Sequence, residues 1–103
     1  MLLIARDEDG ALVGSAAVKH LPDGAAELKR LYVRPHARGT GLGKRLAVAA
    51  MDRARELGYT VMRLDTLPWM ETAQGIYASI GFKPCEPFVE HPIAGVLFFE
   101  LNL

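Results

Sequence analysis

Three glycines stand at alternate positions in the segment Arg38-Gly39-Thr40-Gly41-Leu42-Gly43. Because glycine has no side chain, the backbone N–H groups of such a segment can approach a ligand closely. A helix that begins here adds unpaired N–H donors and a partial positive charge in its first turn. Lys44 and Arg45 stand in that turn, where cations are unfavourable unless an anion binds. The pattern therefore predicts an anion site, most naturally for phosphate.

The spacing of the glycines excludes two common phosphate-binding loops. A Walker A loop requires G-x-x-x-x-G-K-[ST], but Gly39 and Gly43 are one residue too close. Lys44 is also followed by Arg45 rather than by Ser or Thr. A dinucleotide loop requires G-x-G-x-x-G, and neither Gly39 nor Gly41 starts such a run. Two interpretations stay open for the segment alone: a phosphate-binding loop, or a glycine-rich turn with solvent-exposed basic residues.

The elements around this loop follow from the hydrophobic period, which is two residues before the loop and 3.6 residues after it. Turns at Asp9-Gly10 and Pro22-Asp23-Gly24 separate three predicted strands. The predicted order is β-β-β-α-β-α-β(-β), with strands at 2–5, 11–19, 25–33, 60–65 and 96–103, helices at about 42–57 and 71–80, and a Pro-rich loop at 84–92. In the third strand, we expect one face to carry Glu27, Lys29, Leu31 and Val33, and the other to carry Leu28, Arg30 and Tyr32.

The order of elements and the composition bound the class of protein. A strand, a helix and another strand in the middle imply a crossover, hence an α/β (α+β) fold with a mixed, partly parallel twisted sheet flanked by two helices. We expect residues 1–103 to form a single domain.

Twelve basic and twelve acidic side chains argue against bulk attraction to nucleic acid or to a membrane surface. The dispersed histidines predict no metal site, and the single cysteine, Cys85, predicts no internal disulfide. We expect a cytoplasmic protein.

Two motifs together resemble the GNAT superfamily of N-acetyltransferases. The run Arg38-x-x-Gly41-x-Gly43 is similar to the pyrophosphate motif [QR]-x-x-G-x-[GA] of that family. Residues 73–82 read A-x-x-x-Y-x-x-x-G-F and are similar to a second segment of the family. The resemblance extends over nearly the whole chain, from the Asp9-Gly10 hairpin to the last strand. It implies a GNAT-like acyl-CoA N-acyltransferase fold with acetyl-CoA as the acyl donor.

The resemblance also implies how the cofactor is held. The strands at 25–33 and 60–65 would splay apart, and the pantetheine arm of coenzyme A would lie in the gap. Backbone groups around Leu31 and Val33 would bind the pantetheine amides. Backbone N–H groups would hold the pyrophosphate, and the Arg38 side chain would add charge-assisted bonds. The residues expected to bind the cofactor are Leu31, Tyr32, Val33, Arg38, Gly39, Thr40, Gly41, Leu42, Gly43 and Lys44.

The implied reaction is direct attack of a neutral amine on the thioester carbonyl of acetyl-CoA. It needs a base for the amine, stabilisation of the oxyanion and an acid for the departing thiolate. Tyr77 matches the family tyrosine that serves as the acid; the alternative is a core aromatic on an amphipathic helix. Glu27 lies eleven residues before Arg38, the offset of a strand glutamate that acts as base in histone-type members. The alternative is a surface carboxylate paired with Lys29. Asp65 is a further candidate, for orienting the amine.

The sequence departs from the family pattern in two places. Met70 stands where many members have an asparagine that contacts the cofactor arm, and a thioether cannot replace the amide's donors and acceptor. A complete family domain also has a strand and one or two helices before the hairpin at which this chain begins. These elements usually shape the acceptor site. The fold is therefore expected to be N-terminally truncated, with loops 67–70 and 84–92 bordering the acceptor pocket.

Several interpretations follow from this short form. The chain would pair with a copy of itself as a homodimer that completes the site for an amine-bearing acceptor. Alternatively, it is an acyl-CoA-binding module without turnover, or a fragment of a longer gene product. A third class of function is a small interaction domain whose glycine loop binds no ligand.

Overall fold

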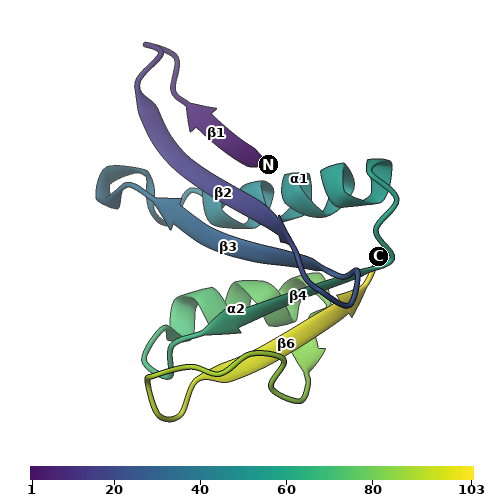
Figure 1. Ribbon diagram of the computed structural model, residues 1–103. Helices are drawn as coiled ribbons and strands as arrows, with labels where there is room; N and C mark the ends of the chain where they lie inside the picture. The colour runs from purple at the N-terminus through teal and green to yellow at the C-terminus, as the bar shows by residue number, and fades with distance from the viewer.

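The computed structural model describes residues 1–103 and consists of one six-stranded sheet with two helices (Figure 1). The strands are β1 Leu2–Arg6, β2 Leu12–His20, β3 Ala26–Val33, β4 Val61–Thr66, β5 Lys83–Pro84 and β6 Leu97–Asn102. The helices are α1 Leu42–Glu56 and α2 Glu71–Ile80, and a 3-10 turn, η1 Pro35–Ala37, follows β3. The predicted succession of strands and helices is confirmed. The order left one further strand open after the second helix, and the short β5 is that strand, although its residues were not predicted; η1 is an addition.

The sheet is mixed, as predicted, and its two halves separate in the middle. The strand order is β1-β2-β3-β4-β6-β5, and only the β3–β4 pair is parallel. That pair consists of two register positions, Ala26 with Met62 and Glu27 with Arg63. Beyond Glu27 the strands diverge, and Figure 1 shows the gap that opens between them. The predicted splay of these strands is therefore confirmed.

The side chains of β3 do not alternate regularly, and the cause is a bulge at Arg30. This residue has a φ of 54°, in the left-handed region. The register with β2 shifts here, so that Arg30 and Leu31 both stand opposite Ala16. Because a bulge inserts one extra residue, the side chains that follow it change face. Leu28 and Leu31 consequently both pack on the core, and the predicted common face of Glu27 and Leu31 is wrong.

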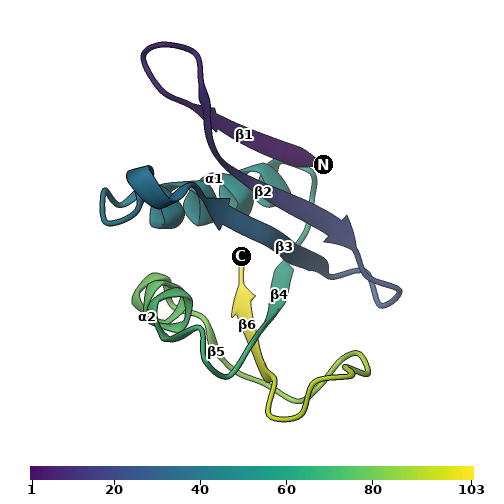
Figure 2. The ribbon, with the colours of Figure 1, turned by 90° about the vertical axis from the view of Figure 1, so that its left-hand side faces the viewer.

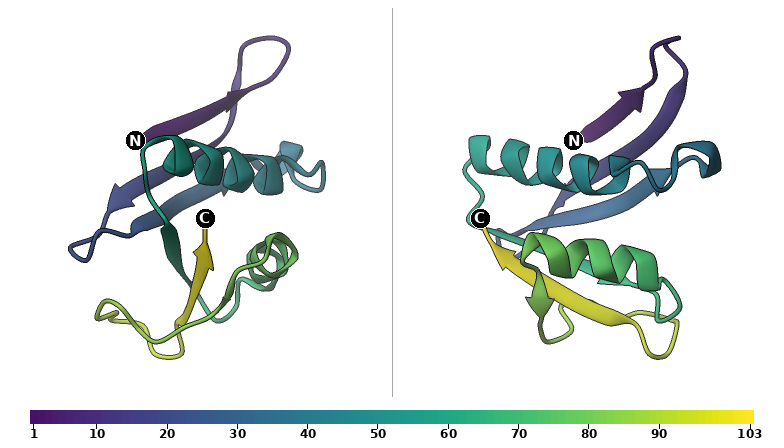
Figure 3. Two further views of the ribbon diagram at one scale, coloured as in Figure 1. Left: turned by 90° about the vertical axis from the view of Figure 1, so that its right-hand side faces the viewer. Right: turned by 180° about the vertical axis from the view of Figure 1, so that it is seen from behind.

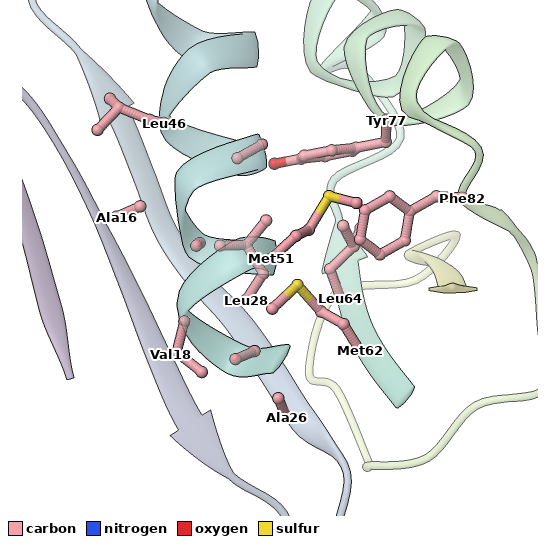
Figure 4. Packing of buried hydrophobic residues seen from close by; sticks show 13 residues of the cluster. Ala16, Val18, Ala26, Leu28, Leu46, Met51, Met62, Leu64, Tyr77 and Phe82 are labelled. Atoms are coloured by element: carbon pink, nitrogen blue, oxygen red, sulfur yellow. The ribbon is translucent and has the colours of Figure 1, made fainter. Parts of the chain in front are cut away.

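Both helices cover the same face of the sheet (Figure 3). The face of α1 that meets the sheet is rich in alanine, which lets the helix approach closely, and α1 ends before Gly58, as predicted. The side chains buried together are Ala16, Val18, Ala26, Leu28, Leu46, Ala47, Ala50, Met51, Ala54, Met62, Leu64, Tyr77 and Phe82 (Figure 4). Figure 2 shows the molecule turned by 90°, with α1 behind β3 and with α2 lower in the view, next to the half of the sheet that contains β4 and β6. Neither helix has the length and apolar character needed to cross a membrane.

Arg63 of β4 ties together three parts of the chain on the face that the helices leave free. Its guanidinium donates to the carboxylate of Asp23 in the β2–β3 turn, and its Nε donates to Oε2 of Glu100 on β6 at 3.2 Å. The guanidinium carbon also lies 6.0 Å from the centre of the Phe88 ring, within the range of a cation–π contact. The hydrogen bond from Arg63 holds the pKa of the Asp23 carboxyl below its usual value.

We expect Asp23→Asn to make the protein less stable at neutral pH. The difference in stability between the two proteins is expected to shrink as the pH falls. A carboxyl whose pKa is depressed by folding contributes stability above its unfolded-state pKa of about 3.9, and loses it as the pH falls through the folded value. The measurement is the melting temperature of both proteins between pH 7 and pH 2.5. The difference is expected to be small, because the pair is exposed, and to close at the acid end. Asp9→Asn, which removes a carboxylate with no ion pair, is the control; an equal shift there would contradict the assignment.

Candidate active site

The three glycines of the loop between β3 and α1 serve two different structural purposes. Gly39 and Gly41 have φ values of 79° and 81°, in the left-handed region that favours glycine. Gly43 lies at a close approach instead. A Cβ at Gly43 would stand 3.3 Å from Cδ1 of Ile76 on α2 and 3.7 Å from Cγ2 of Val33 on β3. Two glycines therefore turn the chain into the helix, and the third lets α1 pack closely against its neighbours.

The loop presents a continuous run of free backbone donors. The N–H groups of residues 39–44 donate to no acceptor within the chain, whereas those on either side are bonded, Arg38 to Pro35 and Arg45 to Gly41. The run includes the first turn of α1, which carries no acidic side chain. Helix polarity adds a partial positive charge at this end. The geometry therefore fits an anion that accepts several N–H bonds at once, as the sequence predicted.

Two side chains hold the loop in this shape. Nε of Arg38 donates to the carbonyl oxygen of Val33 at 3.1 Å, and Oγ1 of Thr40 donates to the carbonyl oxygen of Ala37 at 2.6 Å. Both bonds close the chain back on β3 and η1. The predicted contact of Arg38 with phosphate stays a prediction, as does the predicted binding role of Thr40.

Tyr77 of α2 is a buried member of the core and also a candidate acid. It is 7% exposed, and its ring meets Phe82 edge to face at 5.8 Å. Figure 4 shows the ring extending from α2 toward α1 with the hydroxyl at its tip. Burial raises the pKa of Tyr77 above 10, and the negative charge of Asp65 raises it further. The phenol is therefore protonated at neutral pH and has a proton to donate.

Glu27 of β3 is buried. The interpretation of Glu27 as a surface carboxylate is therefore wrong. Glu27 is 2% exposed, and its Oε2 accepts no hydrogen bond. The predicted pairing with Lys29 is present: Nζ lies 3.5 Å from Oε2, a distance at which the ion pair makes no hydrogen bond. A buried carboxylate oxygen without a hydrogen-bond donor is unfavourable. A polar ligand at Glu27 would remove that cost.

Glu27 lines a cavity of about 570 Å³. Its walls come from the end of β2 and the turn after it (residues 19–22), from Glu27 and Lys29 of β3, from Asp65 of β4 and from Val89, Glu90 and His91 in the loop after β5. This size falls in the range of small-molecule sites. The predicted candidate Asp65 is thus brought together with Glu27, and part of the 84–92 loop lines the same cavity.

The other loop expected at the pocket, residues 67–70, lies elsewhere. Trp69 is 65% exposed and does not line the cavity. Nε2 of Gln74 in α2 donates to the carbonyl oxygen of Leu67 at 3.0 Å, which holds this loop at the start of α2. Lys19 also lines the cavity and was not among the candidates that the sequence indicated. It stands directly opposite Glu27 in the β2–β3 register, a relation that the turn at Pro22-Asp23-Gly24 could have indicated.

The site therefore has a candidate acid and a candidate base that approach from opposite faces of the sheet. Tyr77 lies on the side of the sheet that the helices cover. Glu27 lines the cavity and belongs to β3, one of the two strands that flank the gap. Asp65 links the two sides, because it lines the cavity and its charge acts on Tyr77. Such an arrangement can deliver a proton to one end of a reacting group and remove one from the other end.

Comparison with known proteins assigns the family. The sequence model of the Acetyltransferase (GNAT) family matches residues 1–82, and the chain belongs to that family. It is 41% identical to an uncharacterized N-acetyltransferase of Schizosaccharomyces pombe, over 100% of this chain and 64% of that protein. The chain thus spans less than two thirds of this relative's length.

Solved structures confirm the fold. A Klebsiella pneumoniae protein described as an acyl-CoA N-acyltransferase is 30% identical and superimposes with a TM-score of 0.91, over 99% of this chain and 71% of that one. A Salmonella typhimurium protein described as an acetyltransferase, whose structure contains acetyl-CoA, superimposes with a TM-score of 0.81 at 24% identity, over 98% of this chain and 63% of that one. The predicted GNAT-like fold is confirmed.

Proposed function

We propose that this chain transfers an acetyl group from acetyl-CoA to a primary amine. The observation that carries the proposal is the run of free N–H donors at residues 39–44, because a pyrophosphate offers the several acceptor oxygens that such a run requires. Membership of the GNAT family makes coenzyme A the expected source of that pyrophosphate. The Salmonella typhimurium relative of the same fold contains acetyl-CoA, which supports the choice.

We expect the pantetheine arm to bind between β3 and β4, where the two strands diverge. Beyond Glu27, β3 has no ladder partner on the side of β4, so its backbone groups there are available to a ligand. Leu31, Tyr32 and Val33 lie in this part of β3, between the pyrophosphate loop and the cavity. An extended chain with amide groups can bind such an edge as an added strand would. This position would bring the thioester toward Tyr77.

The proposed reaction is direct acyl transfer. The amine nitrogen forms a bond to the carbonyl carbon of the thioester, and the bond between that carbon and sulfur breaks. Glu27 takes the proton that the amine loses, through a water molecule, and Tyr77 gives a proton to the departing thiolate. Tyr77 is buried and Glu27 lines a cavity, which supports these separate roles. The products are an acetylated amine and free coenzyme A.

A module that binds acyl-CoA without turnover is the alternative function. The ion pair between Lys29 and Glu27 favours it, since Nζ of Lys29 lies 3.5 Å from Oε2 of Glu27, where the acceptor amine would have to stand. The proposed homodimer is supported by apolar side chains on β1, where Leu2 and Ile4 are 62% and 50% exposed. A second copy placed on this face would cover them.

Acetyl-CoA is expected to raise the melting temperature of the protein, and addition of an amine is expected to release free coenzyme A. Gly41→Val is expected to weaken acetyl-CoA binding about 10-fold or more, because the left-handed conformation at Gly41 costs an L-residue roughly 1–2 kcal/mol and the loop must change shape. Calorimetric titration of the folded variant measures this effect.

Gly58→Val is the matched control. Gly58 also has a positive φ, 92°, and open space around it, but it lies at the other end of α1. We expect it to lose stability and to keep its affinity for acetyl-CoA. Equal losses of affinity in both variants, or none in Gly41→Val, would count against the loop as the binding site.

A further inference from the structure

Charged side chains of both signs line the cavity. The carboxylates of Glu27 and Asp65 come from the two strands beside the gap, and Glu27 is the buried one. Lys19 and Lys29 come from the neighbouring part of the wall, on β2 and β3. The loop after β5 adds Glu90 and His91, and the end of β2 adds His20. An acceptor in this cavity therefore meets both negative and positive groups.

The two lysines differ in what they already bind. Nζ of Lys29 lies 3.5 Å from Oε2 of Glu27, so this ammonium occupies the position that an amine needs beside the candidate base. Lys19 is exposed, takes part in none of the ion pairs of the chain, and stands opposite Glu27 in the β2–β3 register. The cavity thus carries one ammonium that is paired with the base and one that is free.

We infer that the acceptor is a small amine that also carries a carboxylate, such as a free amino acid. This inference rests on the proposed function. The amine faces Glu27 and Asp65, and the carboxylate pairs with Lys19 and draws Lys29 away from Glu27. An acceptor with positive charge alone would bring a third cation next to Lys19 and Lys29 and would leave Lys19 without a counterion, and like charges repel. The cavity volume of about 570 Å³ also suits a small molecule.

The test compares three primary amines that carry the same isobutyl group: leucine, leucinamide and 3-methylbutylamine. The readout is kcat/KM for each in the wild type and in Lys19→Gln, at saturating acetyl-CoA. We expect Lys19→Gln to lower kcat/KM about 10-fold for leucine and less than about 3-fold for the two acceptors without a carboxylate, since only leucine loses a charge-assisted pair. The ratio between variants for each acceptor cancels the differences in amine basicity.

Lys83→Gln is the matched control, because Lys83 is an exposed lysine on β5 that neither lines the cavity nor makes an ion pair. It should leave all three acceptors unchanged. If Lys19→Gln lowers kcat/KM equally for the three acceptors, or for none, the inferred class of acceptor is wrong while the proposed acetyl transfer stands. If none of them releases coenzyme A from a protein that binds acetyl-CoA, both the proposed function and this inference are contradicted.

Discussion

Replacing Tyr77 with phenylalanine is expected to lower kcat about 100-fold to 10,000-fold, the usual contribution of a positioned general acid. The substitution removes only a hydroxyl. The ring remains to pack edge to face against Phe82, and the hydroxyl makes no hydrogen bond within the chain whose loss would disturb the fold. Steady-state rates of coenzyme A release, followed with a thiol reagent, measure the effect.

The same substitution separates catalysis from packing. If Tyr77 supplies a proton to the thiolate, the dissociation constant of acetyl-CoA and the melting temperature stay close to those of the wild type while kcat falls. Tyr59→Phe is the control: it removes a hydroxyl that makes an exposed contact of 2.9 Å with Nδ1 of His20, and kcat should change less than about 3-fold. A Tyr77→Phe protein with wild-type kcat would show that the residue is a core aromatic only.

Replacing Glu27 with glutamine is expected to lower kcat/KM about 100-fold or more, the usual contribution of a positioned general base. The amide cannot take the proton that the amine loses, so the loss should appear in kcat and not only in the KM for the amine. Glutamine keeps the shape of a side chain that is 2% exposed. Steady-state kcat and KM for leucine, at saturating acetyl-CoA, are the measurement.

A structural role for Glu27 predicts a different outcome. Loss of the ion pair with Lys29 would change stability and the affinity for the acceptor, but it would leave kcat close to that of the wild type. Glu27→Ala adds a second readout, because acetate or formate ions in the buffer could enter the space left in the cavity and restore part of the rate. A wild-type kcat in Glu27→Gln together with no rescue in Glu27→Ala would remove Glu27 from the mechanism.

Much of the fold was predictable because its signals are local. Asp9-Gly10 and Pro22-Asp23-Gly24 specify turns from their own conformational preferences, and Gly58 and Gly81 stop the helices where the sequence indicated. The bulge at Arg30 could not be predicted in this way, because it depends on how β3 pairs with β2. The two-residue β5 likewise exists only through its pairing with β6.

Some residues of the candidate site were likewise predictable from local sequence, and others were not. The glycine loop and the position of Tyr77 follow from spacing within one short segment each. The burial of Glu27 and the presence of Lys19 in the cavity depend on contacts between β2, β3, β4 and the loop after β5, which lie far apart in the sequence. The prediction that the 67–70 loop borders the pocket was wrong for the same reason. A hydrogen bond from Gln74 in α2, which the sequence does not reveal, fixes the position of this loop.

The most direct test of acetyl transfer is a stoichiometric one. The protein is mixed with acetyl-CoA and leucine, and free coenzyme A and acetylated leucine are quantified together by mass spectrometry. The proposal predicts that coenzyme A release requires the amine and that the two products form in equal amounts over many turnovers. Bound acetyl-CoA that stays intact in the presence of leucine and of the two related amines would contradict the proposal and favour an acyl-CoA-binding module.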